Sequence, residues 1–240
     1  MKTLFSLLLG LSVIQAQVKE VKIGTQVWMA ENLNVFYFKN GDAIPVVKTA
    51  EEWKKADENQ QPACCYYENN AENGKTYGLL YNWYAVNDKR GLAPAGYHIP
   101  TEAEWTKLTT YLGGEEVAGT KMKSTSGWNS YEGEAECNVC KSWTPEQKAG
   151  QPCTTCNDTR KIMAQISGNG TNSSGFNGLP GGFRFNDGTF SNVGWYGYWW
   201  SSIESSTSSA WSRTLGYDVG DVASGNSNKG GGFYVRCLRD

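Results

Sequence analysis

Two Cys-x-x-Cys pairs are the residues of this sequence whose type and spacing best suit chemistry. The pairs are Cys137 with Cys140 and Cys153 with Cys156, and twelve residues separate them. Two tight turns of this kind can present four thiolates to one ion, as in structural tetrahedral zinc sites. Cysteine would fill all four ligand positions, so the spacing predicts a structural zinc ion and leaves no open position for catalysis.

Two other interpretations of the four cysteines remain open. Exported proteins are oxidised, so disulfides could form within each pair or across the two pairs. Redox activity is the third interpretation, although the segment lacks the strand-to-helix context of redox-active Cys-x-x-Cys pairs. The segment between the pairs is polar and rich in turn residues, which is compatible with a loop held in place by a metal ion.

The other three cysteines are the adjacent Cys64 and Cys65, and Cys237 near the end of the chain. Adjacent cysteines rarely bridge each other because the geometry is strained. We therefore expect a disulfide between Cys65 and Cys237, which would join two strands. The alternative is that all three are buried free thiols.

Few other residues point to a reaction. His98 is the only histidine, and its place between a turn and a capped helix predicts a structural role, so we expect no catalytic residues.

Trp195 and Tyr196 follow Gly194 in a predicted turn. We expect these two to be exposed and to bind ligand, because aromatic faces stack on sugar rings. Most other aromatic residues of 174–202 are expected in the core.

Residues 1–16 have the layout of a secretory signal peptide, with Lys2, an apolar run and a small residue at the end. The run is too short to span a membrane. We therefore expect a secreted protein, extracellular or on the outer surface of the cell envelope, with one domain over 17–240. The formal net charge of −2 offers no basic surface, which excludes nucleic acid as an expected partner.

Local patterns predict the elements that position these residues. Capping boxes at Thr49 and Thr101 predict helices over 50–58 and after Pro100. Residues 17–30 predict two short strands around Gly24, and the glycine- and aromatic-rich stretch 174–202 predicts several more. The segments 210–215 and 232–238 alternate as strands. Asn73-Gly74 predicts a turn, 217–229 a polar hairpin or loop, and Trp128 is expected to begin a loop that leads to the cysteines.

Six ordered blocks of the sequence are familiar. They are IGTQVWMAENLNV (23–35), TYGLLYNWYAV (76–86), LAPAGYHIPTEAEW (92–105), GFNGLPGGFRFNDGTF (175–190), GYWWSS (197–202) and GFYVRCLRD (232–240). Through them the chain resembles the Fibrobacter succinogenes major paralogous domain family, common in exported proteins of Bacteroidetes and Fibrobacteres. The cysteine segment, at about 132–160, departs from the family's commonest form and resembles an insert.

That family is similar to the C-type-lectin-like fold, including its formylglycine-generating-enzyme branch. The resemblance implies an α+β domain with short twisted antiparallel strands, two main helices and long irregular loops. It also implies that the terminal strands pair, with Val21–Ile23 near Phe233–Val235. The calcium and sugar motifs of C-type lectins, EPN or QPN and WND, do not occur in this sequence.

The resemblance does not supply an activity. Formylglycine-generating enzymes use two closely spaced cysteines that hold copper, whereas the corresponding part of this chain has only Cys237. We therefore predict a non-catalytic binding or cell-surface module whose ligand is a glycan or a protein. The alternatives are an oxidase of the formylglycine-generating type that uses Cys237, and a purely structural envelope protein.

Overall fold

The computed structural model describes residues 18–143, 153–157 and 161–240. The predicted signal peptide, residues 1–16, lies outside the described residues. The domain is α+β, with mostly short strands. In chain order the elements are β1 (Glu20–Ile23), β2 (Gln26–Met29), α1 (Ala50–Glu58), β3 (Cys64–Cys65), a 3-10 turn (Tyr67–Asn69), α2 (Ala71–Tyr77), β4 (Leu80–Tyr81), α3 (Trp83–Val86), β5 (Tyr97–His98), α4 (Glu102–Tyr111), α5 (Glu115–Met122), β6 (Ser130–Glu136), β7 (Lys161–Ser167), β8 (Gly181–Arg184), β9 (Phe190–Val193), β10 (Tyr196–Glu204), β11 (Ser209–Gly216), β12 (Ala223–Asn228) and β13 (Leu238–Arg239).

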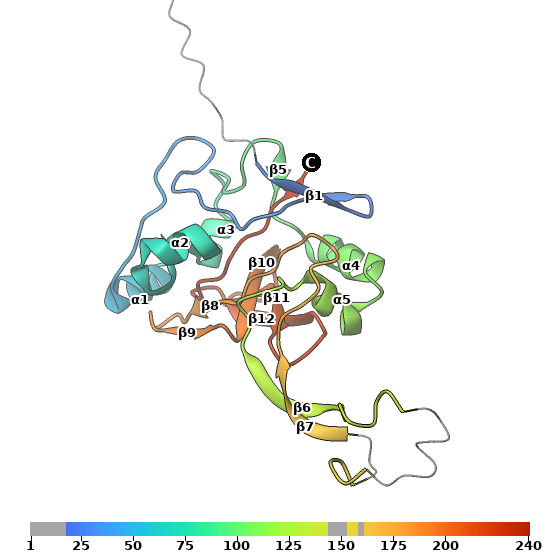
Figure 1. The fold of residues 1–240 in the computed structure, drawn as a ribbon. Coiled ribbons are helices and arrows are strands. Elements are labelled where there is room, and N and C mark those ends of the chain that lie inside the picture. Colours follow the sequence, from blue (N-terminus) through green and yellow to red (C-terminus); the bar gives the residue numbers. More distant parts are fainter. Residues whose placement is uncertain (1–17, 144–152, 158–160) are drawn as a thin grey trace, which may run out of the picture.

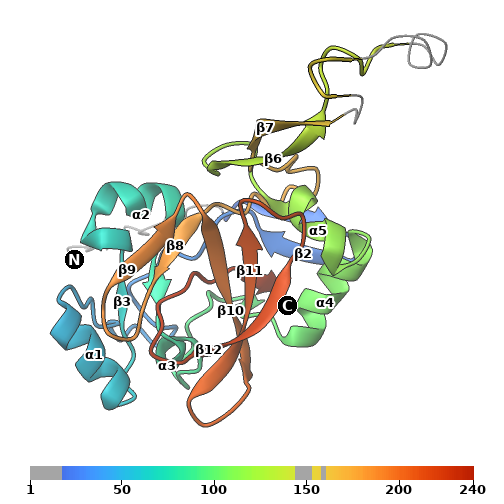
Figure 2. The same cartoon turned by 90° about the horizontal axis from the view of Figure 1, so that it is seen from below.

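The largest sheet has five strands in the order β12-β11-β10-β8-β9, all antiparallel neighbours except the parallel pair β10 and β8. A second sheet, β1-β2-β13-β5, joins the two ends of the domain, and β3-β4 and β6-β7 are two-stranded. Helices α1 and α2 lie on one side of the five-stranded sheet, and α4 and α5 lie on the opposite side (Figures 1 and 2). Among the helices of the described residues, none has the length and apolar character to cross a bilayer.

Both predicted capping boxes are present. The Thr49 hydroxyl accepts from the Glu52 N–H at the start of α1, and the Glu52 carboxylate accepts from the Thr49 N–H. Thr101 and Glu104 make the same reciprocal pair at the start of α4. These bonds satisfy N–H groups that a helix start leaves without partners, and they fix both helix starts at the predicted residues.

The terminal strands pair, but not with the implied partners. Leu238 of β13 lies opposite Trp28 of β2, and the Met29 N–H donates to the Cys237 carbonyl (2.9 Å). The predicted strand 232–238 is therefore mostly a connection between sheets, in which Phe233 bridges to Tyr81 and Tyr234 to Trp199. Residues 233–236 are buried on both faces, so their alternation does not mark one exposed face.

Two local predictions are wrong for physical reasons, and a third, the polar hairpin or loop at 217–229, is partly right. Asn73-Gly74 lies inside α2, not in a turn. Glycine is needed there because a Cβ would stand 2.1 Å from the Tyr66 ring. The segment after Trp128 is strand β6, because its partner β7 arrives about thirty residues later. The polar segment 217–229 contains β12, which pairs with β11 along its whole length.

Aromatic side chains fill much of the core. The rings of Trp28, Trp105, Phe176 and Trp199 form one packed group, with neighbouring centroids 4.8–5.9 Å apart. The prediction for the aromatics of 174–202 holds in part. Phe176, Trp199 and Trp200 are fully buried, whereas Phe185 is exposed. The other three outside the turn at Trp195 are partly buried and pack against the core: Phe183, Phe190 and Tyr198.

Strands β6 and β7 form an arm that projects from the rest of the domain (Figures 1 and 2). Their register is continuous from Ser130 opposite Ser167 to Glu136 opposite Lys161. The arm carries the four clustered cysteines at its far end. At its root, the Gly168 N–H donates to the Asn129 carbonyl (3.1 Å), which closes the two chain ends against each other.

Candidate metal centre and aromatic surface

The arm brings the two Cys-x-x-Cys pairs together. Cys137 directly follows β6, and the second pair precedes β7 by a few residues. Each pair spans a tight turn: the Lys141 N–H donates to the Cys137 carbonyl (2.9 Å), and the Cys156 N–H donates to the Cys153 carbonyl (3.3 Å). The strand pairing therefore places two separate turns side by side, with their cysteines facing inward.

The four sulfur atoms form a compact group. All lie within 4.8 Å of one another, and the Cys137–Cys153 and Cys140–Cys156 Sγ distances are 3.7 Å. Thiolates in tetrahedral array at 2.3 Å from an ion are about 3.8 Å apart, whereas disulfide sulfurs are about 2.05 Å apart. None of the four forms a disulfide within the described residues, and all four are buried. The predicted cluster is confirmed as a group that could hold a metal ion.

The local backbone favours the metal-binding form of Cys137. The backbone N–H of Cys140 donates to the sulfur of Cys137 and lowers the pKa of that thiol. Burial acts to raise this pKa, but the net result is a pKa of about 7 for Cys137. The Val139 N–H and the neighbouring thiols act in the same direction as Cys140. Trp143 and Ile162 pack against the cluster and cover it. A thiolate is the form of cysteine that ligates metals.

The predicted disulfide between Cys65 and Cys237 is not formed; both are free thiols in different core clusters. The reason is the pleat of β3, in which consecutive side chains point to opposite faces. Cys64 points into the cluster that contains Cys237, and Cys65 points away from it. Burial raises the pKa of Cys65 to about 11 and that of Cys237 to about 12.

His98 holds the C-terminal residue against α4. Its Nδ1 lies 2.8 Å from Asp240 Oδ1, and its Nε2 lies 2.9 Å from Glu104 Oε1. Partial burial acts to lower the pKa of His98, but the hydrogen bonds to the two carboxylates outweigh burial and raise it overall. Glu104 is also the capping residue of α4, so both partners of the imidazole serve the fold.

Trp195 is exposed, as predicted, in the turn between β9 and β10. Trp195 is 42% exposed, and its backbone N–H donates to the Asn192 carbonyl (3.0 Å). Asn192 and Gly194 both have positive φ (69° and 82°), a conformation that favours asparagine and glycine. The turn therefore presents the indole outward on a well-ordered backbone.

Tyr217 organises the aromatic residues around Trp195. Its ring lies 4.5 Å from Trp195 at 88°, 6.1 Å from Tyr196 at 79° and 5.9 Å from Tyr131 of the arm at 90°. These edge-to-face contacts fix the rings relative to one another. Tyr196 is only half-exposed and sits opposite Gly216. We call Tyr131, Trp195, Tyr196 and Tyr217 the aromatic surface.

A family model described as the Fibrobacter succinogenes major domain matches residues 21–239. The chain belongs to this family. The match extends from β1 to β13 and includes the arm, so it covers nearly every described element. A search of curated proteins and a search of solved structures each return no match.

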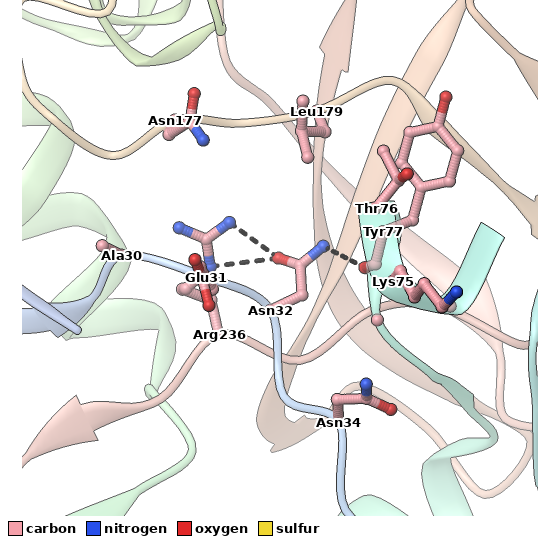
Figure 3. A pocket seen from close by; sticks show the side chains of 12 residues that line it. Ala30, Glu31, Asn32, Asn34, Lys75, Thr76, Tyr77, Asn177, Leu179 and Arg236 are labelled. Carbon is pink, nitrogen blue, oxygen red and sulfur yellow. Dashed lines mark hydrogen bonds between the residues drawn. The ribbon is translucent and has the colours of Figure 1, made fainter. Parts of the chain in front are cut away.

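In this member of the Fibrobacter succinogenes major domain family, four of the six sequence blocks meet around a cavity of about 150 Å³ (Figure 3). Its lining comes from the segments 30–34, 74–78 and 177–179, and from Arg236. Asn32 lies at the centre, where its side chain accepts from Arg236 and donates to the Tyr77 carbonyl (2.8 Å). Sequence reasoning did not identify this cavity, because no local pattern shows which loops converge.

Sequence reasoning also missed Tyr131 and Tyr217 in the aromatic surface. They stand in segments predicted as a loop and as a hairpin or loop, and they meet because the root of the arm lies beside the end of β11. The alternation of residues 130–136 against 161–167 was the one available signal. Pairing those segments would have placed Tyr131 on the same face as Ile162 and Ile166.

Proposed function

We propose that this domain is an exported, non-catalytic binding module with a C-type-lectin-like fold, and that its aromatic surface binds a glycan. Its short strands, paired termini and peripheral helices agree with that fold. The observation that carries the proposal is the exposed indole of Trp195, held edge-on by Tyr217. A rigid, outward aromatic face suits the C–H face of a sugar ring and loses little conformational freedom on binding.

Polar groups flank this indole. The Asn129 amide lies against Gly194, beside Trp195, and makes no side-chain hydrogen bond within the described residues. Asp218 is exposed next to Tyr217. Sites for small polar ligands combine apolar walls with a few placed polar groups. The surface therefore offers stacking together with donors and acceptors for hydroxyl groups.

The non-catalytic assignment rests on where the reactive residues lie. An oxidase of the formylglycine-generating type would need an accessible thiolate. Cys237 is fully buried, and its pKa is raised to about 12. His98 has both ring nitrogens engaged by carboxylates. Neither residue suits the nucleophile or general base of an enzyme.

We further propose that the cysteine cluster binds zinc as a structural ion. Four inward-facing thiols match the ligand set of closed structural zinc sites. The ion would join the two turns at the end of the arm. Metal analysis of the purified protein should find about one zinc per chain, lost in Cys137→Ser. A protein without metal and without free thiols in the cluster would contradict this assignment.

A glycan array tests the ligand. Wild type should bind one class of glycan, and Trp195→Ala should weaken binding at least about tenfold, because stacking on the indole is lost. Tyr37→Ala is the matched control, since Tyr37 is also an exposed aromatic (63%) but lies outside the aromatic surface. Equal losses in both variants, or no glycan bound by wild type, would refute the glycan assignment. N-terminal sequencing of protein from the culture medium tests export, with Gln17 expected first.

A further inference from the structure

Four aromatic side chains continue from the aromatic surface across the five-stranded sheet. The ring centroids of Tyr196 and Tyr198 in β10 lie 6.0 Å apart. Tyr198 lies 4.8 Å from Phe183 of β8, and Phe183 lies 4.3 Å from Phe185, just beyond the end of β8. We call Tyr196, Tyr198, Phe183 and Phe185 the aromatic row. Tyr196 belongs to both sets, so the row and the aromatic surface are continuous.

The pleat of the strands places these rings on one face of the sheet. Side chains two residues apart point to the same side of a strand, which aligns Tyr196 with Tyr198 and Phe183 with Phe185. Strands β8 and β10 pair in parallel and run side by side (Figure 2). Their register sets Phe183 beside Tyr198. The row therefore follows the strand direction, from the turn at Trp195 towards the end of β8.

The row is most exposed at its far end and is anchored in its middle. Phe185 is 44% exposed, close to the 42% of Trp195 at the opposite end. Phe183 and Tyr198 are half-buried and pack against the core cluster of Phe233, whose ring stacks on Tyr198 (5.0 Å, 25°). The core thus holds the inner rings in place while part of each stays accessible. A continuous apolar strip on a domain surface marks an interaction site.

The strip carries no charge. Arg184 interrupts the row in the sequence, but it points to the opposite face, where it is fully buried between the rings of Trp53 and Phe190. None of the four members of the row is ionised at neutral pH. The row therefore offers no cation to balance the carboxylates or sulfates of an acidic ligand, and its chemistry favours a neutral one.

Polar groups lie beside the rings. The Asn192 amide donates to the Tyr198 hydroxyl oxygen (3.2 Å), which leaves the hydroxyl proton to donate to a ligand. Thr214 of β11 is the register partner of Tyr198 and is half-exposed, so its hydroxyl lies on the same face. Apolar walls with a few placed polar groups are typical of sites for polar organic ligands. This combination suits a chain of sugar rings.

We propose that the ligand of this domain is a linear, neutral polysaccharide of the β-1,4-glucan or β-1,4-mannan type, which lies along the aromatic row. The proposal rests on the proposed glycan function and extends its site. Equatorially linked pyranose chains are flat and extended, with apolar C–H groups that stack on aromatic rings. The steps of 4.3–6.0 Å along the row are comparable with one sugar residue of such a chain. An α-1,4-linked chain coils and would leave the row.

Phe185→Ala separates this extension from the site at Trp195. Phe185 is exposed, and its backbone bonds to Thr189 (2.8 Å) and Gly188 (3.0 Å) remain possible in the variant, so the fold should be kept. Tyr37→Ala is the matched control, because Tyr37 is an exposed aromatic residue outside the row. A thermal melt of each variant checks that it is folded.

Calorimetry with cellobiose, cellohexaose, mannohexaose and maltohexaose measures the effects of chain length and chain shape. Cellohexaose or mannohexaose should bind wild type at least about tenfold more tightly than cellobiose, because more rings are contacted at once. Maltohexaose should bind more weakly than either. Phe185→Ala should weaken hexaose binding about fivefold or more and leave cellobiose binding nearly unchanged. Trp195→Ala should weaken both, and Tyr37→Ala neither.

Unchanged hexaose affinity in Phe185→Ala, or equal affinity for cellobiose and the hexaoses, would overturn the extension and leave a glycan site at Trp195. Maltohexaose as the tightest ligand would overturn the assignment to an extended chain. If neither β-linked hexaose binds, this proposal is wrong. A glycan bound on the array would then still support the proposed function, whereas an array without binding would refute both.

Discussion

Removal of the zinc ion that we propose for the cysteine cluster should unfold the end of the arm and leave the body of the domain folded. Among the partly buried apolar residues that the structure describes, Trp143 and Ile162 pack against the cluster, and the cluster shares no member with the two core clusters. A two-stranded hairpin without other support is marginally stable in water. Structural zinc binding is strong enough to hold such a segment.

The structure limits how far the change can spread. The ring contact between arm and body is the edge-to-face pair of Tyr131 and Tyr217. A pair of this kind contributes about 1 kcal/mol beyond its buried area. For a domain of this size, 1 kcal/mol corresponds to roughly 2–4 °C in Tm. We therefore expect the body to lose no more than that when the arm unfolds.

Hydrogen exchange followed by mass spectrometry measures both regions at once. Chelator treatment or Cys137→Ser should increase exchange about tenfold or more in peptides from 130–143 and 161–167, and leave β10 and β11 protected. Val139→Ser is the control, because it alters an exposed residue of the same turn and keeps its backbone N–H. Loss of protection in β10 and β11 together with the arm would refute the reasoning, as would an arm that chelation leaves unchanged.

Three further predictions concern the body. The pKa of His98 is raised in the folded protein. The imidazole therefore stabilises the fold fully below its unfolded pKa of about 6.5, and this stabilisation is lost as pH rises through the folded-state pKa. The Tm difference between wild type and His98→Gln should therefore shrink from about pH 6 to about pH 9, and a constant difference would contradict this. Arg213→Met should cost about 2 kcal/mol in urea unfolding, because it leaves the partly buried Glu102 without its ion pair, whereas the exposed Glu115 can be solvated; a loss under about 1 kcal/mol would show that the pairs are dispensable. Gly74→Ala should destabilise the protein, although alanine normally favours a helix interior by about 1 kcal/mol, since the new Cβ would meet the Tyr66 ring; in a Tyr66→Ala background the sign should reverse.

The features that the sequence predicts well are those set by residues close together in the chain. A capping box needs only four residues, so the starts of α1 and α4 were predicted to the residue. The spacing of the cysteines was enough to predict the cluster, because each Cys-x-x-Cys pair folds into its own turn. Only the approach of the two turns to each other depends on the pairing of β6 with β7.

What the sequence could not show depends on distant partners. Residues 130–136 lack the β-branched residues that usually mark strands, and they become a strand because β7 pairs with them. The expected disulfide is not formed, and nothing in a two-residue strand reveals which of Cys64 and Cys65 enters the core cluster of Cys237. The cavity beside Arg236 is lined by four segments spread along the chain, so it is visible only in three dimensions.

The root of the arm has a consequence for how this family can vary. Ser130 and Ser167 face each other as the first pair of the hairpin, and Gly168 is bonded to Asn129 just beneath them. Chain that leaves and re-enters the body at adjacent points can be shortened, lengthened or exchanged without altering the geometry of the remainder. The arm is thus a natural grafting position, where a different hairpin or a short turn could replace the cysteine-bearing one on an unchanged scaffold.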